Sequence, residues 1–173
     1  MTFISIEFLL FFAVIVFAYY SIPHRWRWVL LLAASYSFYA SLSGYFVFLL
    51  LTSTAFSYVT GILIEKQETK KQKKKVMLVG IGVLLFFLGW FKYFNLVNDS
   101  LRAISAYLNW NYTIPYQEII LPIAISFYTF QAVSYLVDIY RGKLKAERHS
   151  GYFSIYFAFF PQLVAGPIER AKK

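Results

Sequence analysis

The chain has 173 residues, of which 60% are hydrophobic, 22% are aromatic and 14% are charged, and its formal net charge is +9. Soluble domains contain about 25% charged residues, so this chain has too little polar surface to cover a water-soluble globule. Its basic residues stand in short blocks between apolar runs, a pattern that indicates membrane topology and not nucleic-acid binding. The absence of cysteine excludes disulfides, thiolate nucleophiles and cysteine-ligated metals.

The apolar runs predict an all-α fold: one polytopic transmembrane helix bundle over residues 1–173. Helices are expected because they satisfy their own backbone polar groups in lipid. A proline after the first run and a Ser43-Gly44 turn after the second separate the early segments. The membrane segments are predicted at residues 4–20, 29–41, 45–64, 76–94, 119–140 and 152–168.

A charged run at residues 65–75 separates the third and fourth segments. It contains six lysines, two glutamates and no apolar residue, so it is predicted to be a solvated loop. Recruitment of an acidic partner or an anionic lipid is the alternative interpretation. Because it is the densest lysine cluster, the run is expected in the cytoplasm of a cell-membrane protein. Residues 141–148, Arg25 and Arg27 then fall on the same side, and the N-terminus falls outside.

Residues 95–116 differ from the other segments because their apolar residues keep to one helical face. The polar residues of this stretch lie on or near the opposite face. This pattern predicts an amphipathic helix in the membrane interface, capped by Asn98 or Asp99. The apolar face consists of Val97, Leu101, Ile104 and Leu108, spaced four, three and four residues apart.

The fifth segment carries polar residues within an apolar run and is predicted to be helical from about Pro122 to Tyr140. Such groups are expected to face the bundle interior or a water-filled path. Two interpretations of them stay open, hydrogen bonding between helices and contact with a ligand. Gln131, Ser134, Tyr135 and Asp138 share one face, and Ser126 and Thr129 add hydroxyls nearer the start.

Asp138 is the one acidic residue of the fifth predicted segment. An ion pair with Arg141, one turn later, is the simpler interpretation. Substrate binding or proton transfer is the alternative. His24 and His149 both fall in basic interfacial stretches, so neither is expected to be a catalytic group, which needs a positioned partner and a site that excludes water.

The sixth segment is predicted to be broken. Residues 152–160 are an uninterrupted run, but helix geometry is expected to break near Pro161 or Gly166. Basic residues flank both ends of the segment, which favours a re-entrant segment over a single crossing. Broken backbone at membrane depth must be buried in protein or line a wet cavity, so this segment indicates a functional cavity.

Two stretches resemble signature blocks of the membrane-bound O-acyltransferase family, in its bacterial alginate O-acetyltransferase branch. The first comprises residues 121–131 and 134–142, and the second comprises residues 159–170. Residues 38–40 and 90–95 are similar to the same branch. Ala124 stands where the first block is expected to contain glycine. Gln131 and residues 161–165 favour this branch over the D-alanyl transferases.

The resemblance implies transfer of an acyl group from a cytoplasmic donor, acetyl-CoA or another acyl carrier, through an intramembrane tunnel. The expected acceptor is a hydroxyl of an exported polysaccharide or an extracytoplasmic acyltransferase partner. No metal and no bound cofactor are expected in the chain itself. The residues predicted to line the tunnel are Ser126, Gln131, Tyr135, Asp138, Pro161, Gln162, Gly166, Pro167 and Arg170.

The family's catalytic histidine lies beyond its second block, and neither His24 nor His149 matches the context of that residue. The resemblance therefore implies that these residues are an N-terminal part, without the catalytic part and inactive alone. Three other functions stay open: a transporter or channel module, D-alanyl or peptidoglycan O-acyl transfer within the same family, and a scaffold that recruits partners through residues 65–75.

Overall fold

The computed structural model describes residues 5–108, 110 and 121–166. Every regular element within these residues is a helix, which confirms the all-α prediction for this part of the chain. The elements are α1 (Ile6–Ser21), the 3₁₀ turn η1 (His24–Trp26), α2 (Arg27–Ser43), the 3₁₀ turn η2 (Gly44–Phe46), α3 (Val47–Lys66), α4 (Lys70–Tyr107), α5 (Ile125–Tyr140), α6 (Ser150–Ala158) and α7 (Phe160–Ala165).

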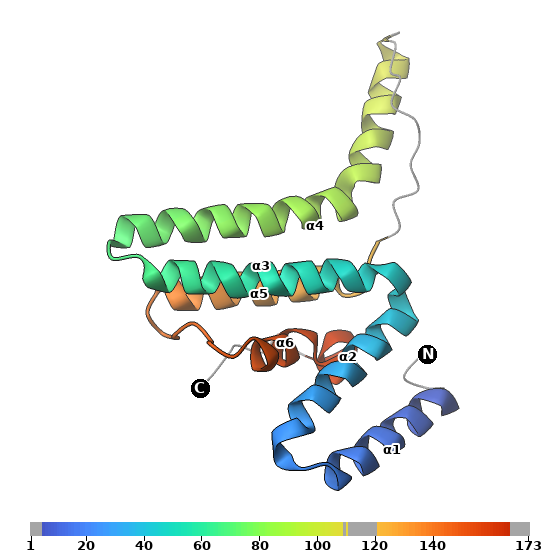
Figure 1. The fold of residues 1–173 in the computed structure, drawn as a ribbon. Coiled ribbons are helices and arrows are strands. Elements are labelled where there is room, and N and C mark those ends of the chain that lie inside the picture. The colour runs from blue at the N-terminus through green and yellow to red at the C-terminus, as the bar shows by residue number, and fades with distance from the viewer. Residues whose placement is uncertain (1–4, 109, 111–120, 167–173) are drawn as a thin grey trace.

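The helices α3, α4 and α5 pack against one another, with α4 antiparallel to α3 (Figure 1). Small residues allow this close packing. A Cβ atom added at Gly61 would lie 2.7 Å from the ring of Tyr135, and one added at Gly80 would lie 2.6 Å from the Thr60 methyl group. Small residues at helix contacts are characteristic of helices that associate in membranes.

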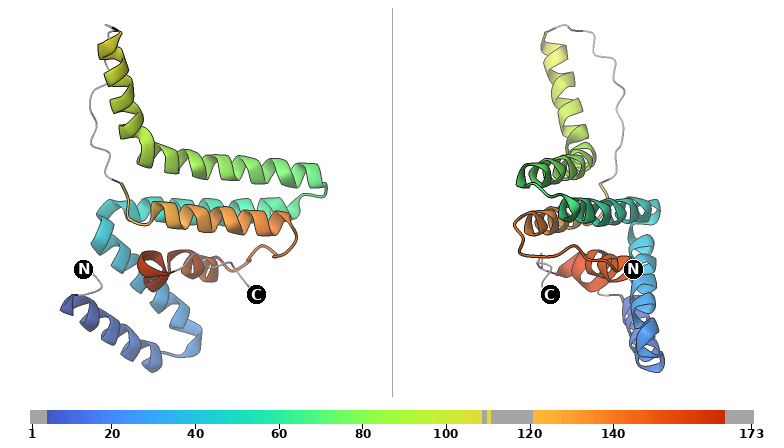
Figure 2. Two further views of the ribbon diagram at one scale, coloured as in Figure 1. Left: turned by 180° about the vertical axis from the view of Figure 1, so that it is seen from behind. Right: turned by 60° about the vertical axis from the view of Figure 1, so that its left-hand side comes forward.

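A second group of helices covers the other side of α3 and α5. The helix α6 contacts α2, α3 and α5, while α7 and α1 both contact α2 (Figure 2). An aromatic cluster joins α1, α2 and α7, because the ring of Phe160 lies 5.8 Å from that of Phe11 and 5.5 Å from that of Phe38. Phe160, the first residue of α7, is therefore packed within protein.

Two stretches of the described chain, Gly44–Lys66 and Lys70–Tyr107, are long and apolar enough to cross a membrane, and α1 is a shorter apolar helix. Many large apolar side chains on these helices have no protein neighbour to cover them. Phe17 is 78% exposed and Phe86 is 64% exposed. Lipid is the solvent that suits such faces.

The prediction that residues 65–75 form a loop is wrong for most of the run. The helix α3 continues to Lys66, and α4 begins at Lys70. Thr69 caps α4, because its hydroxyl oxygen accepts a hydrogen bond from the backbone N–H of Gln72 at 3.3 Å, and the two side chains bond to each other at 2.8 Å. Thr69 is therefore the N-cap of α4, and this cap holds the lysines in helical geometry.

The fourth segment and the amphipathic stretch form one continuous helix. Because α4 has 38 residues and runs to Tyr107, the prediction that a new helix starts at Asn98 or Asp99 is wrong. Figure 1 shows that the C-terminal part of α4 turns away from α3 and α5. Residues 109 and 111–116 of the predicted amphipathic helix lie outside the described residues.

The fifth segment is helical as predicted, but α5 begins at Ile125 and not at Pro122. The reason is Ala124, whose φ of 62° places it in the left-handed region, where a right-handed helix cannot pass. The backbone N–H of Ile125 bonds to the Pro122 carbonyl in the turn before the helix. Glycine adopts this conformation most easily, which explains why glycine is expected at position 124.

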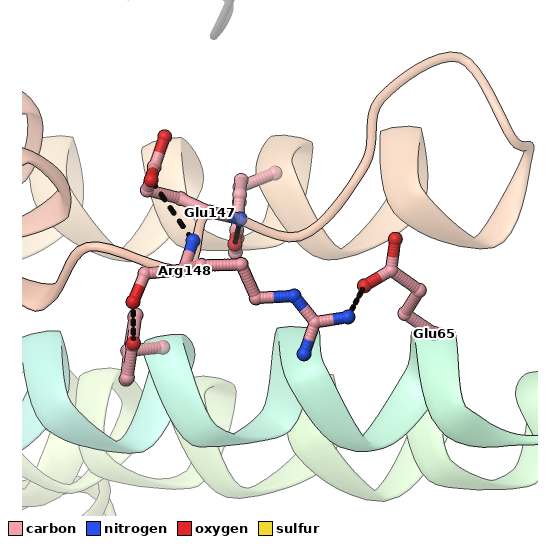
Figure 3. A network of polar contacts seen from close by, with 5 residues as sticks. Glu65, Glu147 and Arg148 are labelled. Carbon is pink, nitrogen blue, oxygen red and sulfur yellow. Dashed lines mark hydrogen bonds and ion pairs between the residues drawn. The ribbon is translucent and has the colours of Figure 1, made fainter.

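The basic blocks gather at one end of the bundle, as predicted. Arg148 forms an ion pair with Glu65 at the end of α3 (Figure 3). The backbone carbonyl of Arg148 also accepts a hydrogen bond from the Tyr58 hydroxyl at 2.6 Å. Trp28, at the start of α2, lies 5.1 Å from the ring of His149. Residues 65–75 and 141–148 therefore emerge together.

Candidate functional site

The sixth segment is broken between α6 and α7, near Pro161 as predicted. The helix α6 ends at Ala158, and Phe159 leaves helical geometry with a ψ of 113° before α7 begins. Proline has no N–H to donate, and its ring clashes with the carbonyl four residues earlier, so an unbroken helix through Pro161 is disfavoured. The helix α7 then ends at Gly166, the other predicted breakpoint.

Two buried side chains from other helices pair the backbone groups that the break releases. In an unbroken helix the N–H of Phe160 would bond to the carbonyl of Tyr156. Here the Gln131 amide nitrogen of α5 donates to the Tyr156 carbonyl at 2.8 Å. The Ser35 hydroxyl of α2 accepts from the Phe160 N–H at 3.3 Å. Because unpaired backbone groups are costly away from water, these two side chains stabilise the break.

One face of α2 makes hydrogen bonds to two irregular parts of the chain. The hydroxyl of Ser35 donates to the Leu31 carbonyl at 2.8 Å, so its lone pair remains for the break. Tyr39 lies one helical turn later, and its hydroxyl donates to the Ile123 carbonyl at 2.8 Å. Both side chains are buried. This face therefore positions the broken segment and the left-handed turn before α5.

Three buried polar atoms lie on α5 and α7 with no hydrogen-bond partner among the described residues. They are the Gln131 amide oxygen, the Tyr128 hydroxyl and the Gln162 amide nitrogen. Tyr128 and Gln131 are three residues apart and therefore share one face of α5. Buried polar atoms are almost always paired in proteins, so unpaired ones indicate where water or a polar group of a substrate binds favourably.

Tyr135 and Asp138, further along α5, have different environments. The Tyr135 hydroxyl accepts a hydrogen bond from the Glu147 N–H at 3.2 Å and its ring lies 4.8 Å from that of Phe153. Hydrogen bonding between helices is thus confirmed for Gln131, whereas Tyr135 bonds to the connection between α5 and α6. The expected ion pair of Asp138 with Arg141 does not form in the described part of the chain, where Arg148 pairs instead with Glu65.

The residues predicted to line a tunnel occupy three places. Gln131 and Tyr135 are buried on α5, whereas Ser126 and Asp138 are half-buried there. The tunnel-lining role itself stays a prediction. Pro161, Gln162 and Gly166 are half-buried in or after α7, and Pro167 and Arg170 lie outside the described residues.

Ser35 and Tyr39 are site residues that the sequence pattern did not single out. They lie four residues apart in an apolar segment, and that spacing was a signal of one polar helix face. Tyr39 falls within the stretch 38–40 that carries the resemblance, and both it and Phe38 are buried.

The two histidines lie away from the break between α6 and α7. His149 caps α6, because its Nδ1 accepts a hydrogen bond from the Tyr152 N–H at 3.2 Å, and its ring stacks 4.3 Å from that of Tyr152. His24 is exposed in η1. Within residues 5–108, 110 and 121–166, no group of three His, Cys, Asp or Glu residues is arranged to hold a metal ion.

Comparison with known proteins identifies membrane-enzyme relatives. The probable alginate O-acetylase AlgI of Pseudomonas putida is 40% identical over 155 residues, which cover 89% of this chain and 32% of the relative. The corresponding protein of Pseudomonas aeruginosa is 39% identical over 166 residues, covering 94% of this chain and 31% of the relative. The peptidoglycan O-acetyltransferase of Helicobacter pylori is 28% identical over 170 residues, covering 84% and 31%.

The relatives are much longer than this chain, which spans about a third of their length. No protein-family model matches the chain, and no solved structure matches it.

Proposed function

We propose that this chain supplies the membrane scaffold and part of the acyl path of an O-acetyltransferase. The chain is homologous to the alginate O-acetylases, as its resemblance to the membrane-bound O-acyltransferase family predicts. The relatives are O-acetyltransferases by name. The proposed reaction is acetyl transfer to hydroxyls of an exported polysaccharide. It belongs to the complete enzyme, of which the described helices form one part.

The observation that carries this proposal is the polar interior beside the α6–α7 break. An acyl group in an apolar environment still has a carbonyl oxygen, which needs hydrogen-bond donors. The Gln162 amide nitrogen is a buried donor with capacity to spare, and the Gln131 amide oxygen is a buried acceptor. The buried Tyr128 hydroxyl shares the α5 face of Gln131 and lies within reach of the Tyr39 hydroxyl. We assign these three side chains to the lining of the acyl path, and the acid–base step to another part of the enzyme.

The proposed orientation follows from the shared position of the basic blocks. Positively charged ends face the cytoplasm, so residues 65–75 and 141–148 are assigned to that side and the N-terminus to the outside. The segment 152–168 is then re-entrant, and the C-terminal part of α4 lies in the outer interface. An acetyl-CoA or other acyl-carrier donor approaches from the basic end, and the polysaccharide or an extracytoplasmic acyltransferase partner receives the acetyl group outside.

The choice of acceptor rests on the degree of similarity. Identity is 40% to the alginate O-acetylase and 28% to the peptidoglycan O-acetyltransferase. An alginate-like polysaccharide is therefore the proposed acceptor, with peptidoglycan as the second candidate.

A gene disruption tests the proposal. The amount of acetate that mild base releases is measured separately from the exported polysaccharide and from peptidoglycan. Loss from the polysaccharide alone is the expected result, and complementation with the intact gene restores it. Loss from peptidoglycan alone would move the acceptor to the second candidate. Unchanged acetylation of both polymers, together with altered uptake of a solute, would replace the enzyme proposal by transport.

A further inference from the structure

A groove runs between α3 and α4 beside the turn that joins them, and its volume is about 420 Å³. This turn lies at the basic end of the bundle, at the left of Figure 1. The apolar part of the groove is formed by Phe56 and Leu63 of α3 and by Val76 and Val79 of α4. Gln67 and Lys75 line its polar part, close to the turn.

None of the residues that the structure describes fills the apolar part of this groove. Leu63 is 44% exposed and Val79 is 58% exposed, although both are aliphatic. The groove is closed at its base by a close helix contact. Gly80 lines the groove, and a Cβ atom at that position would lie 2.6 Å from the Thr60 methyl group. An apolar molecule in the groove would therefore cover side chains that the bundle itself leaves uncovered.

The length of the groove matches one leaflet of a bilayer. Phe56 and Gln67 are eleven residues apart on α3, which corresponds to about 17 Å along a helix. The apolar core of a membrane is about 30 Å thick, so the groove follows roughly half of it. One acyl chain of a lipid in the leaflet at the basic end has this extent.

The positive charge at the polar end of the groove favours a lipid with an anionic headgroup. Lysines occupy positions 70, 71, 73, 74 and 75, within the first two turns of α4. The nearby Glu65 already pairs with Arg148, so its carboxylate is partly neutralised. Thr69 caps α4, and Lys75 lines the groove. A cluster of lysines at a membrane surface attracts anionic lipid.

We propose that this groove binds an anionic phospholipid, with an acyl chain along Leu63 and Val79 and the phosphate at Lys75. The inference does not depend on acetyl transfer, since it rests only on the groove, its length and its charge. Such a lipid would hold the α3–α4 turn at the membrane surface and anchor the basic end of the bundle.

Retention of lipid by the full chain tests the proposal. The chain is purified from a membrane that contains equal amounts of phosphatidylglycerol and phosphatidylcholine, and native mass spectrometry measures the lipid that it keeps. Preferential retention of phosphatidylglycerol is the expected result. Lys75→Gln is expected to weaken that retention about fivefold, because it removes the lysine that lines the groove and would face the phosphate. Val79→Trp, which fills the groove, is expected to abolish it.

Two neighbouring variants provide matched controls. Lys74→Gln removes the same charge from an exposed lysine outside the groove, and Leu78→Trp introduces the same side chain at a residue that is 53% exposed and does not line it. Both are expected to retain phosphatidylglycerol as the unmodified chain does. Equal retention of the two lipids, or equal losses in Lys74→Gln and Lys75→Gln, would overturn the proposal. Displacement of the lipid by inorganic phosphate would also overturn it, because the acyl chain would then contribute nothing.

Discussion

In α3, α4 and α5 the helices are regular and their backbone groups pair within each helix, whereas α6 and α7 are separated by a break whose groups depend on Gln131 and Ser35. The regular helices need only complementary shapes where they touch, such as Gly80 beside Thr60. The break needs a donor and an acceptor at two particular positions. We therefore expect the first region to be sensitive to lost volume and the second to lost hydrogen bonds.

The largest expected effect is loss of volume in the regular group. Leu136 is fully buried on α5 and lies against Gly80 of α4. Leu136→Ala leaves a cavity that close-packed helices do not refill, so the free energy of unfolding is expected to fall by about 3 kcal/mol. Unfolding in mixed micelles of a mild and a denaturing detergent measures this change.

A leucine on the outer surface of the bundle provides the control, because replacing it removes the same atoms without leaving a buried cavity. Leu85→Ala, at a residue that is 43% exposed on α4, is expected to change the free energy of unfolding by less than about 0.5 kcal/mol. Equal losses in the two variants would mean that the three helices are not packed as a unit, and the contrast between the two regions would then disappear.

The next largest effect concerns the break. Gln131→Leu conserves much of the side-chain volume but leaves the Tyr156 carbonyl without its donor, and is expected to cost about 2 kcal/mol. Ser35→Ala, which removes the acceptor of the Phe160 N–H, is expected to cost about 1 kcal/mol. The same unfolding assay measures both variants, and hydrogen exchange at the Phe160 amide should quicken in Ser35→Ala.

A double variant combines Gln131→Leu and Ser35→Ala, because both side chains pair backbone groups at the same break. The double variant is expected to lose less than the sum of the single losses, since a break already weakened at Tyr156 gains less from Ser35. Gln67→Leu is the control, because the Gln67 amide donates to a carbonyl of its own helix at an exposed position. A loss in Gln67→Leu as large as that in Gln131→Leu would contradict a special role for the break.

The same contrast explains what the sequence could predict. Apolar runs identify helices, and the lack of an N–H in Pro161 identifies a break, because both effects act within a few residues of the chain. The common end of residues 65–75 and 141–148 follows from charge. The partners of the break could not be predicted, since Ser35 precedes Phe160 by 125 residues and nothing local joins them.

Two of the three wrong helix boundaries have local causes. Thr69 and Gln72 carry a capping-box sequence pattern that marks the start of α4, but the charge of the lysines around them favours a solvated loop. At α5 the helical pattern extends to Pro122, and no property of an alanine indicates the left-handed φ of Ala124. Gln131 was identified as a site residue from its spacing on α5, whereas its bond to Tyr156 required the fold.

The smallest expected effect, which has the opposite sign, concerns the turn before α5. Ala124 has a φ of 62°, and the Tyr39 hydroxyl holds the neighbouring Ile123 carbonyl. A left-handed alanine carries a cost of about 1–2 kcal/mol that glycine avoids. Since glycine also gains entropy in the unfolded chain, Ala124→Gly is expected to stabilise the protein by about 1 kcal/mol. The unfolding assay measures this gain.

The control for this gain is an alanine in ordinary helical geometry. Ala103→Gly, at an exposed position within α4, is expected to lower the free energy of unfolding by about 1 kcal/mol, because glycine is a poor helix former. Opposite signs in the two variants would locate strain in the turn that Tyr39 holds. A loss in both would mean that position 124 is an ordinary helical residue, and that α5 is held by its own regular geometry, as α3 and α4 are, and not by α2.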